Sequence, residues 1–168
     1  MAFEYSMDRI AGKVGERARL YNFKVIIGQG FPDISQKLIV SCSTPKLTIE
    51  GIPIAWTSTS YEINGKGTFD PITLTIQENI KGEVLKGFYD WNNKCINLEN
   101  KEFTGVRYEE LVKTMEIHQL DASGNEAFRY VMYDCIPEGM PTITYSYEGS
   151  AVVQYDMTIK YLSYEVFN

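Results

Sequence analysis

Alternating apolar and polar positions mark most of this chain as extended. In residues 72–76, Ile72, Leu74 and Ile76 share one face while two threonines share the other, which is the two-residue period of a strand buried on one side. The same kind of pattern predicts strands at 21–27, 37–42, 108–120, 127–135, 142–147 and 152–166. A mainly β fold follows.

One segment has a helical period instead. Residues 83–93 carry apolar side chains at spacings of three and four on an otherwise polar surface. This stripe predicts a single flanking helix, whose packing or outward contact face consists of Val84, Leu85, Phe88 and Trp91.

The segment 45–67 fits neither a core strand pair nor a linker. It is polar and broken at Gly51-Ile52-Pro53, and we expect it to close on the glycines of 64–67, yet its Thr, Trp and Ile content is wrong for a flexible linker. We therefore expect a projecting arm that finds its partner on another subunit. Its candidate contact residues are Leu47, Ile49, Ile52, Ile54, Trp56, Tyr61 and Ile63.

Length and charge narrow the class of protein. The 168 residues suit one domain spanning 1–168, with 1–20 as an N-terminal arm. Sixteen basic against 22 acidic residues give a formal charge of −6, which argues against a protein that grips a phosphate backbone. We expect no membrane segment and no secretory signal, because no apolar run approaches the roughly 18–20 residues of a span.

Reactive side chains are few. Cys42, Cys95 and Cys135 are far apart and His118 is the single histidine, so we expect no metal site, no cofactor and ordinary packed thiols. The best candidate for an enzyme is a pair of His118 with Cys95 or Cys135, but no local signature of an activated thiol accompanies either cysteine. We expect a protein that is not an enzyme.

Several motifs, in order, resemble one family. The stretch GKGTFDPITLT at 65–75 precedes a helix that ends in FYDWNN at 88–93. Later come VMYDCIP at 131–137 and YDMTIKY at 155–161, and LYNFKV opens the series at 20–25. This order resembles the tail tube proteins of contractile-tailed bacteriophages. The chain departs from the family pattern at Asp134-Cys135, where a glycine is common, and across 94–106.

The resemblance implies a fold and an assembly. The expected subunit is a β-sandwich or barrel-like domain with one flanking α-helix and a long extended arm, closing into a ring-shaped β-barrel as a homohexamer. Stacked rings would form a virion tail tube, assembled in the host cytoplasm, with the arm bridging subunits or rings and the helix side toward the sheath protein. Baseplate and tail-terminator proteins are the other implied partners, and DNA would pass through the lumen without specific binding.

Acidity suits such a conduit. From residue 130 onward the sequence has five acidic residues and one basic residue, Lys160. This segment therefore contributes −4 of the formal charge of −6. An acidic, hydroxyl-bearing wall would repel phosphate rather than bind it. The candidate lumen residues are Gln154, Asp156, Thr158 and Lys160, or else the residues that face away from Met115 on its strand.

Alternatives remain at this stage. Within the same superfamily the chain fits a tube initiator, a tail terminator or the tube of a secreted or extracellular injection system. From another class, a tyrosine-rich β-sandwich binding module would use exposed aromatic side chains for recognition. The alternating positions of the late tyrosines suit packing better: Tyr145, Tyr147, Tyr155, Tyr161 and Tyr164.

Overall fold

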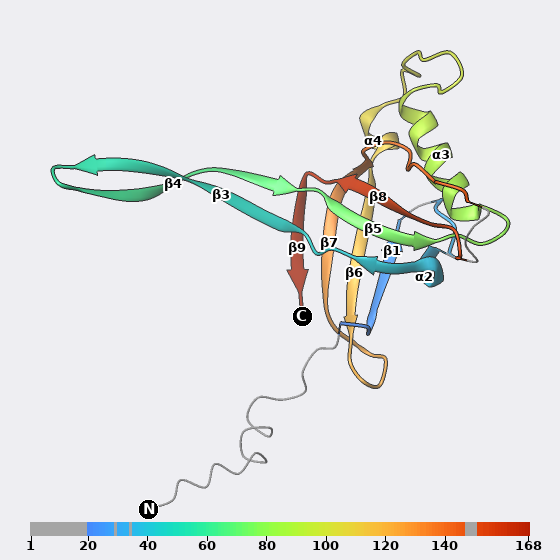
Figure 1. Cartoon of the computed structure of the whole chain (residues 1–168), viewed down its shortest axis with the longest axis horizontal. Coiled ribbons are helices and arrows are strands. Elements are labelled where there is room, and N and C mark those ends of the chain that lie inside the picture. Colours follow the sequence, from blue (N-terminus) through green and yellow to red (C-terminus); the bar gives the residue numbers. More distant parts are fainter. Residues whose placement is uncertain (1–19, 29, 34, 147–150) are drawn as a thin grey trace, which may run out of the picture.

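Two antiparallel layers of strands form the body of the molecule, and a two-stranded ribbon leaves it (Figure 1). The computed structural model describes residues 20–28, 30–33, 35–146 and 151–168. The expected N-terminal arm therefore lies outside the described residues, apart from Leu20. The mainly β subunit with a flanking helix and an extended arm is confirmed.

The first layer contains strands β1 (Phe23–Ile27), β6 (Lys113–Leu120), β7 (Glu126–Pro137) and β9 (Ser163–Phe167), in the order β1-β6-β7-β9. All of its pairings are antiparallel. The β6–β7 hairpin turns where the sequence predicted it, because Asp121 Oδ1 accepts hydrogen bonds from the backbone N–H groups of Ser123 and Asn125, both at 2.8 Å.

The second layer contains β2 (Ile39–Cys42), β5 (Ile72–Gln77) and β8 (Gln154–Lys160), in the order β2-β5-β8. It joins the first layer through the end of β7, where Ile136 and Pro137 pair with Lys160 and Ile159. The alternation predicted for 72–76 is confirmed, since Ile72, Leu74 and Ile76 are fully buried.

The core lies between the two layers. Val25, Met115 and Met132 enter it from the first layer, while Leu74, Met157 and Ile159 enter it from the second. Each of these side chains is no more than 1% exposed. At roughly 1.5–3 kcal/mol for each large apolar side chain removed from water, this shared core is the main source of stability.

Helix α3 (Glu83–Cys95) closes one end of the sandwich (Figure 1). Val84, Phe88 and Trp91 are buried, and Leu85 packs against the core, so the predicted stripe faces the chain's own body. Glu78 stabilises the start of the helix, because its Oε2 accepts from the backbone N–H of Leu85 at 2.8 Å and a carboxylate is favourable there.

The ribbon consists of β3 (Lys46–Trp56) and β4 (Thr59–Asp70). The predicted breaks were wrong: β3 runs through Pro53, and the chain turns at Thr57 and Ser58. Pro53 is tolerated because a two-stranded ribbon leaves one edge of each strand unpaired. Gly65 lies at a bulge where the two strands approach each other closely, since a Cβ there would lie 2.9 Å from the carbonyl oxygen of Glu50.

Four other predicted strands need correction. The segment 37–42 begins in a short helix, α2 (Ser35–Leu38), and 108–120 begins in another, α4 (Tyr108–Leu111). Residues 142–146 form no strand, and Tyr147 lies outside the described residues. The single strand predicted over 152–166 is two strands, because the chain crosses from one layer to the other at Tyr161 and Leu162.

Candidate assembly surfaces

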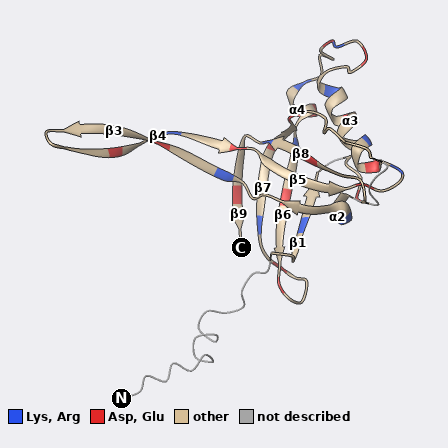
Figure 2. Cartoon of the chain, viewed as in Figure 1, with Lys and Arg blue, Asp and Glu red and all other residues tan. Residues whose placement is uncertain are grey.

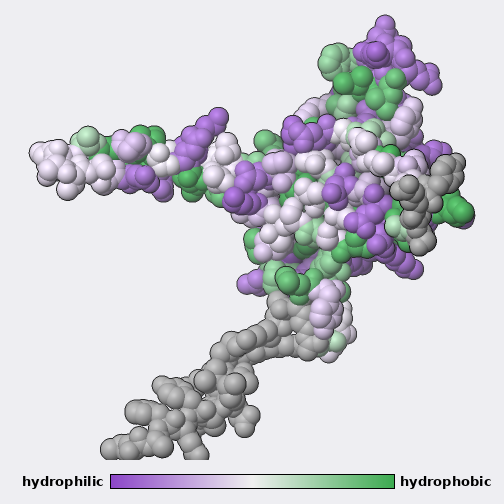
Figure 3. Space-filling model, viewed as in Figure 1, coloured by the Kyte–Doolittle hydropathy of each residue, from purple (hydrophilic) through white to green (hydrophobic). Residues whose placement is uncertain are grey.

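The arm, defined as the ribbon 46–70, exposes apolar side chains that nothing in the described structure covers. Trp56 is 67% exposed and Tyr61 is 50% exposed. Figure 3 shows apolar residues along the arm, and Figure 2 shows few charged residues on it. The side chains predicted as contact residues are all exposed except Ile54, which is half-buried: Leu47, Ile49, Ile52, Trp56, Tyr61 and Ile63.

The apolar side chains in the outer half of the arm, beyond the bulge, gather on one face. Ile52 lies opposite Ile63, and Ile54 lies opposite Tyr61, so cross-strand pairs form a continuous apolar stripe. The other face presents smaller or polar pairs such as Ala55 with Ser60. An isolated two-stranded ribbon is only marginally stable in water. The stripe therefore has the composition of a surface that a partner covers.

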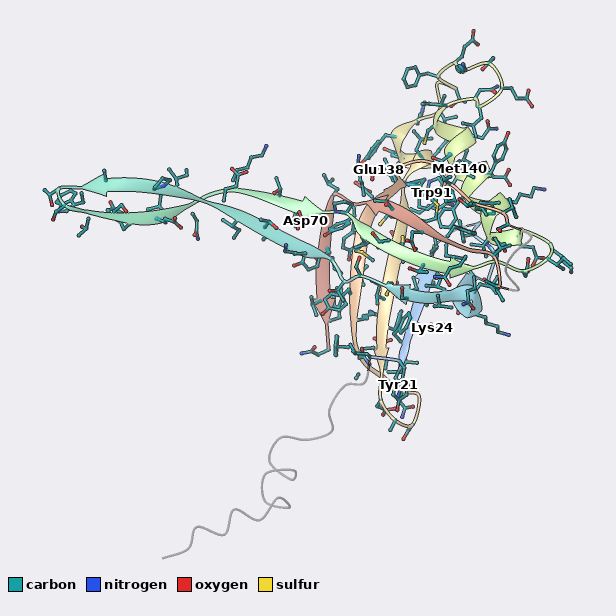
Figure 4. All side chains as sticks on the ribbon, in the orientation of Figure 1. Tyr21, Lys24, Asp70, Trp91, Glu138 and Met140 are labelled. Carbon is teal, nitrogen blue, oxygen red and sulfur yellow. The ribbon has the colours of Figure 1, made fainter. Side chains whose placement is uncertain are left out.

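A polar network holds the root of the arm. Asp70 Oδ2 accepts from Thr48 Oγ1 at 2.9 Å and lies 3.2 Å from Lys46 Nζ. The Thr48 hydrogen bond, followed by Lys46, lowers the pKa of the Asp70 carboxyl below its ordinary value. Figure 4 shows Asp70 where the arm meets the body.

The helix residues have an internal role. Trp91 is 2% exposed, and its Nε1–H donates to the carbonyl oxygen of Leu111 at 2.6 Å. Tyr155 Oη donates to Glu78 Oε2 at 2.6 Å and so ties β8 to the start of α3. Burial is the main cause that raises the pKa of Tyr155 above its ordinary value. The exposed side of α3 carries other residues, including Tyr89 and Asp90.

The outer face of β8 carries the predicted lumen residues. Gln154, Asp156 and Lys160 are exposed and Thr158 is half-buried, on the side of β8 opposite the core. Neighbouring side chains balance these groups: Thr75 Oγ1 donates to Asp156 Oδ1 at 2.7 Å, and Lys160 Nζ lies 3.0 Å from Glu138 Oε1. This face is polar and carries mixed charge.

The outer face of β6, the alternative lumen candidate, carries a charged cluster. His118 is 8% exposed, with Nδ1 2.6 Å from Glu126 Oε2 and Nε2 2.8 Å from Glu116 Oε2. Arg129 Nη1 lies 3.6 Å from Glu126 Oε1 and extends the cluster.

The His118–cysteine pair is not assembled. Both ring nitrogens of His118 contact glutamates on the outer face, whereas Cys135 is fully buried in the core and Cys95, at the end of α3, donates to the carbonyl oxygen of Trp91. Burial raises the pKa of Cys135 to about 12 and that of Cys42 to about 11, which keeps both thiols protonated and unreactive.

The described first layer has two open strand edges. Among the described residues, β1 pairs only with β6, and β9 pairs only with β7. Each strand therefore presents a row of backbone N–H and C=O groups to the outside. Because successive strands of the first layer alternate in direction, β9 runs antiparallel to β1.

Two absences hold for the part of the chain that the structure describes. None of its helices is long and apolar enough to cross a membrane. No group of three or more His, Cys, Asp or Glu side chains within it could hold a metal ion.

Comparison with known proteins identifies the family. A family model for phage tail tube proteins matches residues 32–167, which is most of the chain. The chain belongs to the phage tail tube protein family. A search of curated proteins finds no significant match.

Solved structures share the tail tube fold at low sequence identity. A chain from the sheath–tube complex of an extracellular contractile injection system, PVC, in the extended state is 16% identical, with a TM-score of 0.68 over 97% of this chain and 98% of that one. A chain from the sheath/tube terminator of that system is 15% identical, with a TM-score of 0.69 over 92% and 99%. Hcp1 from Flavobacterium johnsoniae is 7% identical, with a TM-score of 0.51 over 87% and 94%. The expected relationship to tail tube proteins is confirmed by the family model, and these structures show the same fold.

Sequence reasoning missed the residues at the arm's root. Phe69, 42% exposed on β4, packs against Tyr161 and Tyr164, with ring centroids 5.8 Å and 5.9 Å away. The TFDP motif placed Phe69 at the start of a strand, but nothing in the sequence linked it to aromatic residues more than 90 positions later.

Proposed function

We propose that this tail tube family member is a structural, non-enzymatic subunit that forms stacked hexameric rings inside a contractile sheath, as the genome conduit of a bacteriophage tail. The exposed apolar stripe of the arm carries the proposal, because the described part of the subunit gives it no partner. A second copy of the chain offers one without requiring any other protein.

Ring closure follows from the open edges. Pairing β9 of one subunit with β1 of the next would continue the first layer as an antiparallel sheet and remove both edges. Repeated around a ring, this pairing closes a barrel. The arm would then reach a neighbouring subunit or ring and bury its stripe there.

The lumen wall is one of two exposed sheet faces. The outer face of β8 is polar and of mixed charge, and its residues remain our candidates from the sequence: Gln154, Asp156, Thr158 and Lys160. Closure through β1 and β9 favours the outer face of the first layer instead, where the cluster of His118 lies. In either case DNA would meet a polar wall of mixed charge, on which acidic side chains pair with the basic ones, and would pass without specific binding.

Shortening the arm tests the assembly role. Gly51 and Asn64 face each other in the ribbon, so residues 52–63 can be replaced by Asn-Gly, which forms a tight two-residue turn. We expect a folded subunit, shown by an unchanged thermal transition, and no rods in electron micrographs. Thr57→Gly is the control, since Thr57 has a φ of 49° that glycine adopts freely.

A finer test uses the two faces of the arm. Ile63→Glu places a charge within the apolar stripe, whereas Ser60→Glu places one on the opposite face. Rods from the Ser60 variant but not from the Ile63 variant support a buried stripe. Normal rods from both variants would refute the proposed contact.

Labelling decides between the two wall faces. Thr158→Cys on β8 and Thr114→Cys on β6 each place a bulky thiol label on one of the two candidate faces. The label on the face that lines the lumen should appear inside the rod in cryo-EM maps, and the other label should not. The DNA content of purified particles distinguishes a phage tail from an extracellular injection system. Tails that release DNA support a phage role, and particles without DNA support an extracellular injection system.

Solved structures of a sheath/tube terminator and of a baseplate also contain chains with this fold. A tube subunit should polymerise without limit, whereas a terminator should stop at one ring. Analytical ultracentrifugation of the purified chain at rising concentration separates these outcomes.

A further inference from the structure

The arm leaves the body at a point where the backbone ladder is interrupted. The β2–β5 ladder ends with the N–H of Ser43 donating to the carbonyl oxygen of Thr73 at 3.0 Å, and the arm's own pairing begins at Lys46 with Asp70. Pro45 and Pro71 lie in this gap, and neither has a backbone N–H to contribute. Strand pairing alone therefore leaves the arm's direction free to vary.

Tyr161 bridges this gap from the end of β8. Its hydroxyl accepts from the backbone N–H of Lys46 at 3.0 Å and donates to the carbonyl oxygen of Lys46 at 3.2 Å. One hydroxyl has both a proton and lone pairs, so it can do both at once. Burial is the main cause that raises the pKa of Tyr161 above its ordinary value, and the group keeps the proton that it donates.

The ring of Tyr161 adds a second contact, to the other strand of the arm. Phe69, Tyr161 and Tyr164 form a three-ring cluster with centroid distances of 5.8, 5.9 and 6.1 Å. Tyr161 is 8% exposed, so both its hydrogen bonds and its ring contact are shielded from water. Through one side chain, the body contacts both β3 and β4 at the root of the arm.

We propose that Tyr161 is a positioning residue that fixes the angle at which the arm leaves the body. This inference rests on the proposed tube function for its consequence, since an arm held at one angle meets a neighbouring copy in one geometry. The hydroxyl is the decisive group, because it makes both hydrogen bonds to the Lys46 backbone at the interruption.

The variant Tyr161→Phe removes that hydroxyl and retains the ring. Tyr164→Phe is the matched control, since Tyr164 belongs to the same cluster and no hydrogen bond of its hydroxyl is found in the described structure. Hydrogen exchange at the Lys46 amide should quicken about tenfold in Tyr161→Phe, as expected for loss of one ordinary hydrogen bond. It should not change in Tyr164→Phe.

The angle itself is measured in the isolated subunit. Spin labels at Ser58→Cys in the arm's turn and Ser123→Cys in the β6–β7 turn, with Cys42 and Cys95 replaced by alanine, report one distance distribution. We expect it to broaden in Tyr161→Phe alone, with a cooperative thermal transition lowered by only a few degrees. An unbroadened distribution overturns the proposal.

Assembly is scored separately. If the wild-type chain forms no rods, the tube function fails while the distance measurement still judges the role of Tyr161. If the wild type forms rods, Tyr161→Phe should form fewer and shorter ones than Tyr164→Phe, and equal yield and length would overturn the link between arm angle and stacking.

Discussion

β4 and β5 are consecutive in the chain, separated only by Pro71, yet their apolar side chains have opposite environments. In β5 every second residue is fully buried, as at Ile72 and Leu74. In β4, Tyr61 is 50% exposed and Ile63 is 43% exposed. Apolar and polar residues alternate in similar ways in both strands, so the difference in exposure comes from what packs against each strand.

What β4 lacks is a second layer. The side chains of β5 meet those of the first layer across the core, whereas the arm has a single layer of two strands. A sheet is stable when its apolar face packs against another element. The comparison suggests that the arm's missing layer comes from another molecule, and the following changes test that idea.

The largest effect should come from the body. Trp91→Ala removes a buried ring and its hydrogen bond to Leu111, and we expect the free energy of unfolding to fall by about 3–5 kcal/mol. Denaturant titration of the subunit measures this loss. Tyr89→Ala, on the exposed side of the same helix, is the control and should change little.

Matched truncations in the two strands compare them directly. Leu74→Ala should lower the free energy of unfolding of the unassembled subunit by about 2–5 kcal/mol. Ile63→Ala should lower it by about 1 kcal/mol or less, because 43% of the residue is already exposed to water. Similar losses at both positions would mean that the arm is already packed within one subunit.

The tie between β8 and helix α3 should have an intermediate effect. Tyr155→Phe removes the donor to Glu78, and hydrogen bonds to charged groups contribute about 1.5–3 kcal/mol. Thermal unfolding should detect the change. Tyr145→Phe, at a position 76% exposed, should leave the transition where it is.

The smallest effect should be at the arm's root. Because the pKa of Asp70 is lowered in the folded chain, its contribution is fully present above the ordinary carboxyl pKa and is lost as pH falls through the folded value. The protection factors of the arm amides, which are corrected for the slower intrinsic exchange in acid, should therefore fall as pH is lowered, while those of β5 do not. Asp70→Asn should remove the pH dependence, and added salt should weaken the Lys46 contact.

The sequence predicted elements whose local period matched their burial. Residues 72–76 and 83–93 are examples, because each has one buried face and a pattern that records it. The arm's position was predicted too, from its unsuitability for a core. Its internal structure was not predicted, because Pro53 and Gly65 are each compatible with the end of a strand and with a bulged two-stranded ribbon. Only the pairing with the partner strand decides between these two structures.

Long-range contacts left no local signal. The bond between Tyr161 and Lys46 joins residues 115 positions apart, and alternation placed Tyr161 only on a buried face. The cluster of His118, Glu116 and Glu126 likewise depends on the register of β6 with β7. The helical turn at 108–111 was misread because a segment this short has no period of its own.

The pairing distances along the chain have a consequence for synthesis. The arm closes on itself at Thr57 and Ser58, while β1 must wait for β6, whose residue Gln119 pairs with Phe23. Local hairpins form faster than distant strand pairings, so a nascent chain exposes the apolar stripe of its arm before the two layers of its body have formed. Glu50, Glu62 and Lys66 along the ribbon would then keep newly made chains apart until each has finished folding.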